Sequence, residues 1–150
     1  MNASDVMQRD VYTCSIDDKL DRVAGIMVEH DCGCVPLIDP DGKVVAMITD
    51  RDVCKAAYTE GKPLSEIPAS IFASPGVTTV HESAPLEVVE GRIRASRVRR
   101  VPVVDSDQRL VGILTLSDIA VEAGVAAGHY GGLSPEAITQ TLAAVSTHRP

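Results

Sequence analysis

Aromatic side chains are scarce in this 150-residue sequence, which has one phenylalanine, three tyrosines and no tryptophan. Proteins that bind single-stranded nucleic acid stack the bases on such side chains. An excess of positive charge is also missing, since the net charge is −7 and residues 1–75 hold 7 lysines and arginines against 13 aspartates and glutamates. That first half would repel a phosphate backbone at long range. Nucleic acid is therefore not expected as a partner.

Long apolar stretches are absent too. No run approaches the roughly 18–20 apolar residues of a membrane-spanning helix, and the N-terminus MNASDVMQRD has no apolar core of a secretion signal. We expect a cytoplasmic protein with no membrane partner. In that reducing compartment the four cysteines, Cys14, Cys32, Cys34 and Cys54, are interpreted as small apolar side chains. A cysteine-based redox or metal sensor stays as an alternative, although Cys32-Gly33-Cys34 lacks the C-x-x-C spacing of such sites.

Catalytic signatures are missing as well. The sequence has no glycine-rich phosphate loop, no H-E-x-x-H and no G-x-S-x-G, and its four histidines show no ligand spacing. We therefore expect no enzyme, no catalytic residues, no metal site and no required cofactor.

What the chain does contain is an internal repeat. A shift of 66 positions aligns residues 11–53 with residues 77–119 without a gap and with twelve identities. Each copy has the pattern of a short strand, an amphipathic helix, two strands joined by an acidic turn, and a second helix. One copy alone would bury too little surface. We predict an α+β fold of tandem β-α-β-β-α repeats, packed through their sheets with pseudo-twofold symmetry.

The expected boundaries follow from this repeat. We assign residues 1–60 to the first repeat, 61–76 to an ordered linker, 77–124 to the second repeat and 125–150 to a tail with a short helix. The first helix of each copy is expected to have its N-cap at Asp17–Asp18 or at Ser83, with Pro85 inside the first turn. Ile138, Leu142 and Val145 form one apolar stripe in the tail, which docks either on its own repeats or on a second copy of the chain.

Each copy also ends its last strand with a T-x-x-D motif, formed by Thr49 and Asp52 and again by Thr115 and Asp118. At a helix N-terminus the threonine hydroxyl and free N–H groups suit a phosphate, and the aspartate can accept from the hydroxyls of a ribose. The same two residues also form an imperfect capping box, which would account for them without any ligand. The motif leaves both interpretations open.

The doubled order V-P-h-h-D, acidic turn, apolar strand and h-T-x-x-D, where h is an apolar residue, resembles the cystathionine-β-synthase-type (CBS) domain pair, or Bateman module. The resemblance covers roughly residues 5–124 and implies a stand-alone regulatory protein. Members of this family bind adenine nucleotides or other adenosyl compounds in clefts between the repeats, modulate a partner protein and commonly form homodimers. The resemblance thus implies a small-molecule nucleotide, a second copy and an unidentified regulated protein as partners.

The resemblance also suggests which basic residues reach the ligand. Five arginines lie between residues 92 and 100, and Arg99 and Arg100 directly precede Val101-Pro102, where family members carry phosphate-binding residues. The first repeat has Gly33-Cys34 at this place, and Arg51 is the candidate substitute. The two sites are therefore expected to be unequal.

The remaining expectations concern the base and the class of ligand. The base is expected against apolar walls near Cys14 and Val80. AMP, ATP, NAD and S-adenosylmethionine all stay open as ligands, as does a Mg²⁺ ion brought by the phosphates. A dimerisation or scaffolding module that binds no ligand is the alternative function.

Overall fold

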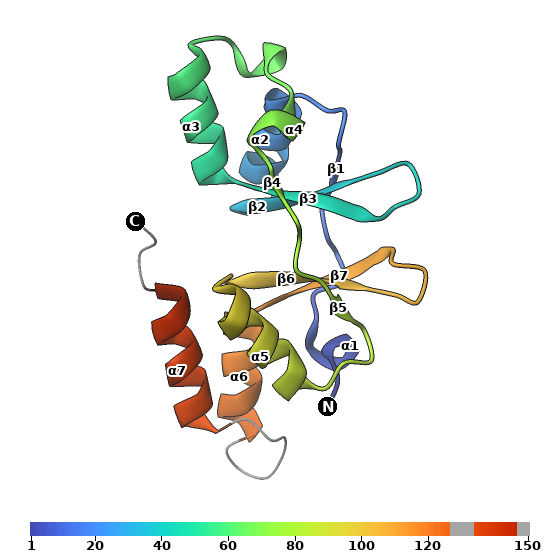
Figure 1. Cartoon of the computed structure of the whole chain (residues 1–150), viewed down its shortest axis with the longest axis vertical. Coiled ribbons are helices and arrows are strands. Elements are labelled where there is room, and N and C mark those ends of the chain that lie inside the picture. The colour runs from blue at the N-terminus through green and yellow to red at the C-terminus, as the bar shows by residue number, and fades with distance from the viewer. Residues whose placement is uncertain (127–133, 147–150) are drawn as a thin grey trace. The chain divides into compact units, whose positions relative to one another are not determined.

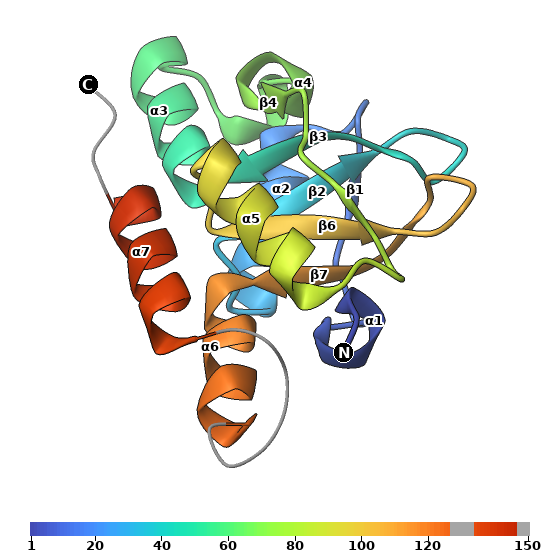
Figure 2. The same cartoon turned by 60° about the horizontal axis from the view of Figure 1, so that its bottom comes forward.

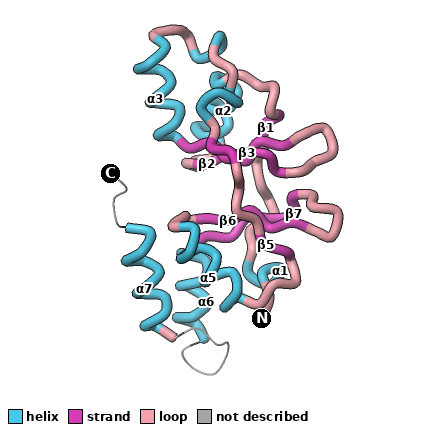
Figure 3. Tube along the Cα trace, viewed as in Figure 1, coloured by secondary structure: helices cyan, strands magenta, loops and turns pink. Residues whose placement is uncertain are grey.

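The structure is a computed structural model that describes residues 1–126 and 134–146, with the side chains of 123–126 and 135 left out of the description. The chain forms two compact units, one of residues Tyr12–Val77 and the other of Met1–Val11 together with the chain from Thr78 onward. Both units contain helices and strands (Figures 1 and 3). None of the helices in the described part is long and apolar enough to span a membrane.

The unit of Tyr12–Val77 contains a four-stranded sheet in the order β1-β2-β3-β4. Strand β1 runs parallel to β2, and the other neighbours are antiparallel. Its elements are β1 (Cys14–Ser15), α2 (Leu20–Glu29), β2 (Cys34–Ile38), β3 (Val44–Thr49), α3 (Asp50–Glu60), the 3-10 helix η1 (Leu64–Glu66), α4 (Ala69–Phe72) and β4 (Ser74–Pro75).

The second unit has a three-stranded sheet in the order β5-β6-β7, again with one parallel and one antiparallel pair. The C-terminal helix α7 packs against α5 and α6 (Figure 2). Its elements are α1 (Ala3–Val6), β5 (Val80–His81), α5 (Leu86–Ser96), β6 (Arg100–Val104), β7 (Leu110–Thr115), α6 (Leu116–Ala126) and α7 (Pro135–Ser146). The tandem β-α-β-β-α fold predicted from the sequence is confirmed.

The acidic turns form in both copies in the same way. Asp39 Oδ1 accepts from the N–H groups of Asp41 and Lys43, both at 2.9 Å, and Asp105 makes the equivalent pair of bonds. The turn after Asp39 uses Gly42 at φ 82°, and the turn after Asp105 has Gln108 at φ 63°. The side-chain bonds therefore specify the turn even where glycine is absent.

The first helix of each copy starts later than expected. Lys19 is the N-cap of α2 and Pro85 is the N-cap of α5, so the predicted caps and the placement of Pro85 inside the first turn are wrong. Asp18 instead accepts from the Ser15 N–H at 2.8 Å, which closes the turn before the helix. The Asp18 carboxylate thus bonds to a residue three positions earlier in the chain and is not used to cap the helix.

The repeat extends further than the aligned sequence indicates. The short helix α1 (Ala3–Val6) recurs 66 residues later as α4 (Ala69–Phe72), and the bridge of Asn2 with Pro85 has its counterpart between Pro68 and Lys19. The predicted linker is thus the opening segment of the second copy. It is ordered, and the side chain of Ile67 lies in the core of the Tyr12–Val77 unit.

These opening segments pair reciprocally. Ser74, in the opening segment of the second copy, pairs with Met47 of β3, whereas Gln8, in the opening segment of the first copy, pairs with Ile113 of β7. Each sheet is therefore continued by the segment that precedes the other copy. The compact units consequently place residues 1–11 with the second repeat and not with the first.

Candidate functional site

Both T-x-x-D motifs cap a helix in the structure. The Oδ2 atom of Asp118 accepts from the Thr115 N–H at 2.8 Å and from its hydroxyl at 2.6 Å, and the Asp118 N–H donates to Thr115 Oγ1 at 3.1 Å. Thr49 and Asp52 make the same three bonds at 2.8, 2.8 and 3.3 Å. The capping interpretation is thus confirmed, and each aspartate keeps one oxygen outside the box. A role of these residues in ligand binding stays a prediction.

The outer oxygens of the two aspartates differ in their surroundings. The Oδ1 atom of Asp118 accepts from the Gln8 side-chain amide at 3.2 Å. For Asp52, no donor to Oδ1 is found within residues 1–126 and 134–146. The second copy therefore carries an additional polar contact on its carboxylate.

The first residue of each capped helix also differs. In α3 this residue is Asp50, whose Oδ1 accepts from the N–H of Arg51 at 2.8 Å. In α6 it is Leu116, and the described chain offers no acceptor to the N–H of Ser117. A helix N-terminus attracts anions through such unpaired N–H groups. In the first copy the Asp50 carboxylate already engages the Arg51 N–H. In the second copy the Ser117 N–H is available to an anion.

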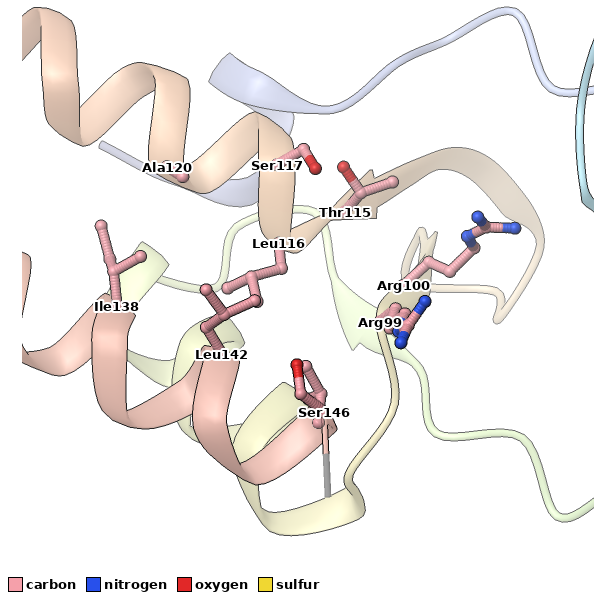
Figure 4. Close-up of a pocket in the computed structure, with 10 residues that line it drawn as sticks. Arg99, Arg100, Thr115, Leu116, Ser117, Ala120, Ile138, Leu142 and Ser146 are labelled. Atoms are coloured by element: carbon pink, nitrogen blue, oxygen red, sulfur yellow. The ribbon is translucent and has the colours of Figure 1, made fainter. Parts of the chain in front are cut away.

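A pocket of about 570 Å³ lies at the N-terminus of α6. Arg99, exposed, and Arg100, half-buried, form one side of it, and no ion-pair partner of either guanidinium is found in the described part of the chain. The Leu116, Ile138 and Leu142 side chains gather on the other side (Figure 4). The remaining lining residues are Thr115, Ser117, Ala120, Val145 and Ser146. The pocket therefore has a cationic end beside a helix N-terminus and an apolar end.

Helix α7 supplies much of the apolar side. Its Ser134 hydroxyl caps the helix by accepting from the Ala137 N–H at 3.2 Å. Helix α7 docks on the second unit of its own chain, with Val145 packed against the core and Leu142 54% exposed, and the predicted stripe of Ile138, Leu142 and Val145 lines the pocket. That second role was missed at the sequence level, because the stripe carries no signal beyond helical periodicity.

A neighbouring face of α7 is attached to α5. The hydroxyl of Thr141 donates to Glu90 Oε1, and both side chains are buried. Arg94 lies 3.9 Å from the other Glu90 oxygen and donates to Gln140 Oε1 at 3.3 Å. These bonds fix how α7 presents its stripe to the pocket.

The structure brings together only part of the predicted set. Arg99, Arg100 and Thr115 line one pocket, and Asp118 lies in the first turn of α6 without lining it. Thr49, Arg51 and Asp52 belong to the other unit, where Arg51 is exposed.

The two predicted base walls are core positions. Cys14 on β1 and Val80 on β5 correspond to each other in the repeat and lie in the separate cores of their units, 2% and 5% exposed. Burial raises the pKa of the Cys14 thiol to about 11, and the nearby Asp18 carboxylate adds to the rise.

Two α+β repeats, each with a capped helix N-terminus after its last strand, define the class of protein as a tandem-repeat domain pair. The sequence model of the CBS domain matches residues 3–59 and 65–123, and the chain therefore belongs to the CBS domain family.

Curated relatives include both short proteins and long enzymes. Hypoxic response protein 1 of Mycobacterium tuberculosis is 33% identical over 118 residues, which cover 79% of this chain and 82% of the relative. Inosine-5'-monophosphate dehydrogenase of Methanocaldococcus jannaschii is 33% identical over 117 residues, 78% of this chain but 22% of the enzyme. The L-aspartate semialdehyde sulfurtransferase of the same organism is also matched over 22% of its length, at 31% identity over 77% of this chain. The chain thus spans about a fifth of these enzymes.

Solved structures share the fold. The crystal structure of Hypoxic Response Protein I with two coordinated zinc ions has a TM-score of 0.73 at 31% identity and covers 81% of this chain and 98% of that one. The CBS domain pair of protein MJ0100, in complex with 5'-methylthioadenosine and S-adenosyl-L-methionine, gives 0.70 at 30% identity over 83% and 97%. A CBS domain protein from Pyrobaculum aerophilum, complexed with AMP, gives 0.72 at 24% identity over 85% and 100%, which shows the common fold.

Proposed function

We propose that this chain is a regulatory module that senses a phosphorylated adenosine-containing nucleotide through its second repeat and modulates a partner protein. The observation that carries the proposal is the pair of guanidinium groups, Arg99 and Arg100, in a pocket at the N-terminus of α6. No catalytic step is assigned to the site. The cytoplasm, where such nucleotides occur, remains the expected compartment.

The chemistry of the pocket supports a phosphate group at its cationic end. Arginine forks bind phosphate oxygens in a bidentate manner, and the Ser117 N–H at the start of α6 adds a donor in the direction of the helix dipole. Any Mg²⁺ ion at this end of the pocket is proposed to arrive with the phosphates of the nucleotide. The volume of about 570 Å³ lies in the range of small-molecule sites.

Different residues are proposed to contact the sugar and the base. Asp118 offers a carboxylate oxygen to ribose hydroxyls, next to the pocket residues Thr115 and Ser117. The apolar side chains of Leu116, Ile138 and Leu142 suit one face of a purine. The adenosyl class is supported by protein MJ0100, whose CBS domain pair binds 5'-methylthioadenosine and S-adenosyl-L-methionine.

The first repeat is proposed to differ in its ligand. Asp50 places a negative charge at the start of α3 and Gly33-Cys34 supplies no cation, so phosphate-rich ligands are disfavoured there. Thr49 and Asp52 remain candidates for the sugar of an adenosyl compound with little charge, and Arg51 is the candidate cation beside them. Cys14 and Val80 are kept as proposed walls of the base sites, although both side chains lie in the cores of their units.

Regulation requires that the ligand favour one conformation of the protein over another. Helix α7 lines the pocket and is therefore the element of this unit whose position a ligand can bias. We also propose a homodimer, supported by apolar side chains that are exposed on α3 and α6, Tyr58 at 93% and Val121 at 66%. Analytical ultracentrifugation with and without nucleotide tests the homodimer.

Two other functions are distinguished by the same experiments. A scaffolding module would dimerise without binding any adenosyl compound. Zinc binding is favoured by one observation, the two coordinated zinc ions of Hypoxic Response Protein I. Metal analysis of purified protein, together with a thiol titration, separates a metal or redox sensor from a nucleotide sensor.

Calorimetry with AMP, ADP, ATP, NAD and S-adenosylmethionine tests the main proposal. The wild type is expected to bind the phosphorylated ligands, and the double variant Arg99→Ala/Arg100→Ala is expected to lose roughly tenfold or more in their affinity. The matched control is Arg92→Ala/Arg97→Ala, which removes two exposed arginines of the same segment outside the pocket. Equal losses in both double variants would show a general charge effect and reject this site.

A further inference from the structure

Gln8 is held firmly beside the α6 N-terminus although it comes from the opposite end of the chain. Its backbone N–H and C=O both bond to Ile113 on β7, each at 2.9 Å. Gly112 permits this approach, since a Cβ there would lie 3.0 Å from the Gln8 carbonyl oxygen and 2.4 Å from Met7 Sδ. The position of Gln8 is therefore set by its backbone and does not depend on its side chain.

The side chain of Gln8 then reaches the carboxylate of the T-x-x-D motif. Its Nε2 atom lies 3.2 Å from Asp118 Oδ1, while Oδ2 of the same carboxylate is engaged by Thr115. The amide thus takes one of the two acceptor positions of the oxygen that the capping box leaves for another donor. Oδ2 already accepts two bonds from Thr115, so two hydroxyls that both bond to this carboxylate need both acceptor positions of Oδ1. One of them must displace the amide, whose bond to a charged acceptor is stronger than a neutral one.

We propose that Gln8 is a specificity-determining residue that competes with sugar hydroxyls for Asp118. This inference rests on the proposed nucleotide function of the second repeat. A ribose whose two vicinal hydroxyls both donate to Oδ1 must replace the Gln8 amide, whereas a sugar without hydroxyls leaves the amide in place. Gln8 therefore lowers the affinity for ribonucleotides and reduces discrimination against sugars that lack the hydroxyls.

The first repeat provides an internal comparison. The residue equivalent to Gln8 after a shift of 66 positions is Ser74, which pairs with Met47 as Gln8 pairs with Ile113. A serine side chain is shorter by two heavy-atom positions, and no bond from Ser74 to Asp52 is found in the described structure. Competition at the carboxylate is thus a property of the second repeat.

The experiment compares AMP with 2',3'-dideoxy-AMP on the wild type, Gln8→Ala, Gln8→Met and the control Ser74→Ala. Gln8→Met keeps the length of the side chain without the N–H donor. It therefore tests the loss of the amide even if Gln8→Ala is poorly folded. Calorimetry is expected to show AMP bound about three- to tenfold more tightly by both Gln8 variants, in proportion to one displaced hydrogen bond. Binding of 2',3'-dideoxy-AMP, and both ligands on Ser74→Ala, should stay unchanged.

Nuclear magnetic resonance locates the effect. The Gln8 side-chain amide signals, assigned from their loss in Gln8→Ala, are expected to shift with AMP and to stay in place with 2',3'-dideoxy-AMP. If the wild type binds AMP but the Gln8 variants bind it equally or more weakly, the competition is overturned and the nucleotide site stands. If neither the wild type nor the variants bind AMP, the proposed function fails and the competition fails with it.

Discussion

The Thr141 hydroxyl on α7 donates a hydrogen bond to the Glu90 carboxylate on α5, and the side chains of both residues are shielded from solvent. This contact joins the C-terminal helix to the second repeat through residues that do not line the pocket. The acceptor, Glu90, is a carboxylate in a buried place. Loss of the Thr141 hydroxyl therefore leaves this carboxylate with one hydrogen bond fewer to offset the cost of its burial.

Thr141→Val keeps the shape of the side chain and removes the hydroxyl. We expect the free energy of unfolding to fall by about 1–3 kcal/mol and the amides of α7 to exchange faster. Urea denaturation and hydrogen exchange measure the two effects. Gln140→Ala, which removes only the exposed bond to Arg94, should change stability by less than about 0.5 kcal/mol. Equal effects of the two changes would argue against the buried bond as the attachment of α7.

Asp50→Ala is expected to open the N-terminus of α3 to anions. Removal of the carboxylate frees the Arg51 N–H, which the Oδ1 atom of Asp50 now engages at 2.8 Å. Titration with inorganic phosphate should then shift the Arg51 amide signal saturably in nuclear magnetic resonance spectra. Asp50→Asn is the matched control, because it removes the same charge but keeps an oxygen acceptor at that place. A phosphate response of the same size in Asp50→Asn would mean that charge alone, and not occupation of the N–H, excludes anions.

Two glycine substitutions are expected to have opposite signs. A Cβ at Gly112 would come within 2.4 Å of Met7 Sδ and 3.0 Å of the Gln8 carbonyl, so Gly112→Ala should destabilise the protein by about 1–3 kcal/mol. Gly91 lies in α5 with nothing within 4 Å of an added Cβ, so Gly91→Ala should stabilise it by about 0.5–1 kcal/mol. Thermal and urea unfolding measure both. A neutral Gly112→Ala would show that the N-terminal segment does not lie against β7 as described.

The Cys14 thiol makes stability fall at alkaline pH. Burial raises its pKa from 9.0 to about 11, so the folded protein holds the proton that the unfolded chain releases above pH 9. Its contribution is complete below pH 9 and is lost as the pH rises toward 11, by an amount on the order of 2–3 kcal/mol. The difference in the free energy of unfolding between wild type and Cys14→Ala, measured by urea denaturation from pH 8 to 11, isolates the contribution of the Cys14 thiol. A constant difference over that range contradicts a buried neutral thiol, as does alkylation of Cys14 as fast as that of the exposed Cys54.

Much of the fold follows from local sequence signals. The 66-residue repeat, the acidic turns at Asp39 and Asp105 and the helices that begin after Thr49 and Thr115 depend on neighbouring residues, and all of them form. The helix starts at Lys19 and Pro85 were placed wrongly, because Asp18 closes a turn and does not cap α2.

Local sequence signals predicted less of the candidate site than of the fold. The arginine pair and Thr115 were identifiable because they flank motifs of the repeat, and they do line a common pocket. Gln8 meets Asp118 across 110 residues of sequence, and this contact depends on strand pairing that no local pattern specifies. The pocket wall from α7 likewise depends on tertiary packing, which periodicity alone does not locate.

The crossed pairing of Gln8 with β7 and of Ser74 with β3 bears on how a two-copy chain arises. A polypeptide with one copy would have an opening arm whose natural acceptor is a different sheet, so two such polypeptides would exchange arms as a swapped dimer. Fusion of two copies into one gene makes this exchange intramolecular and independent of protein concentration. It also leaves each copy free to acquire different residues at equivalent places, as Asp50 and Leu116 illustrate.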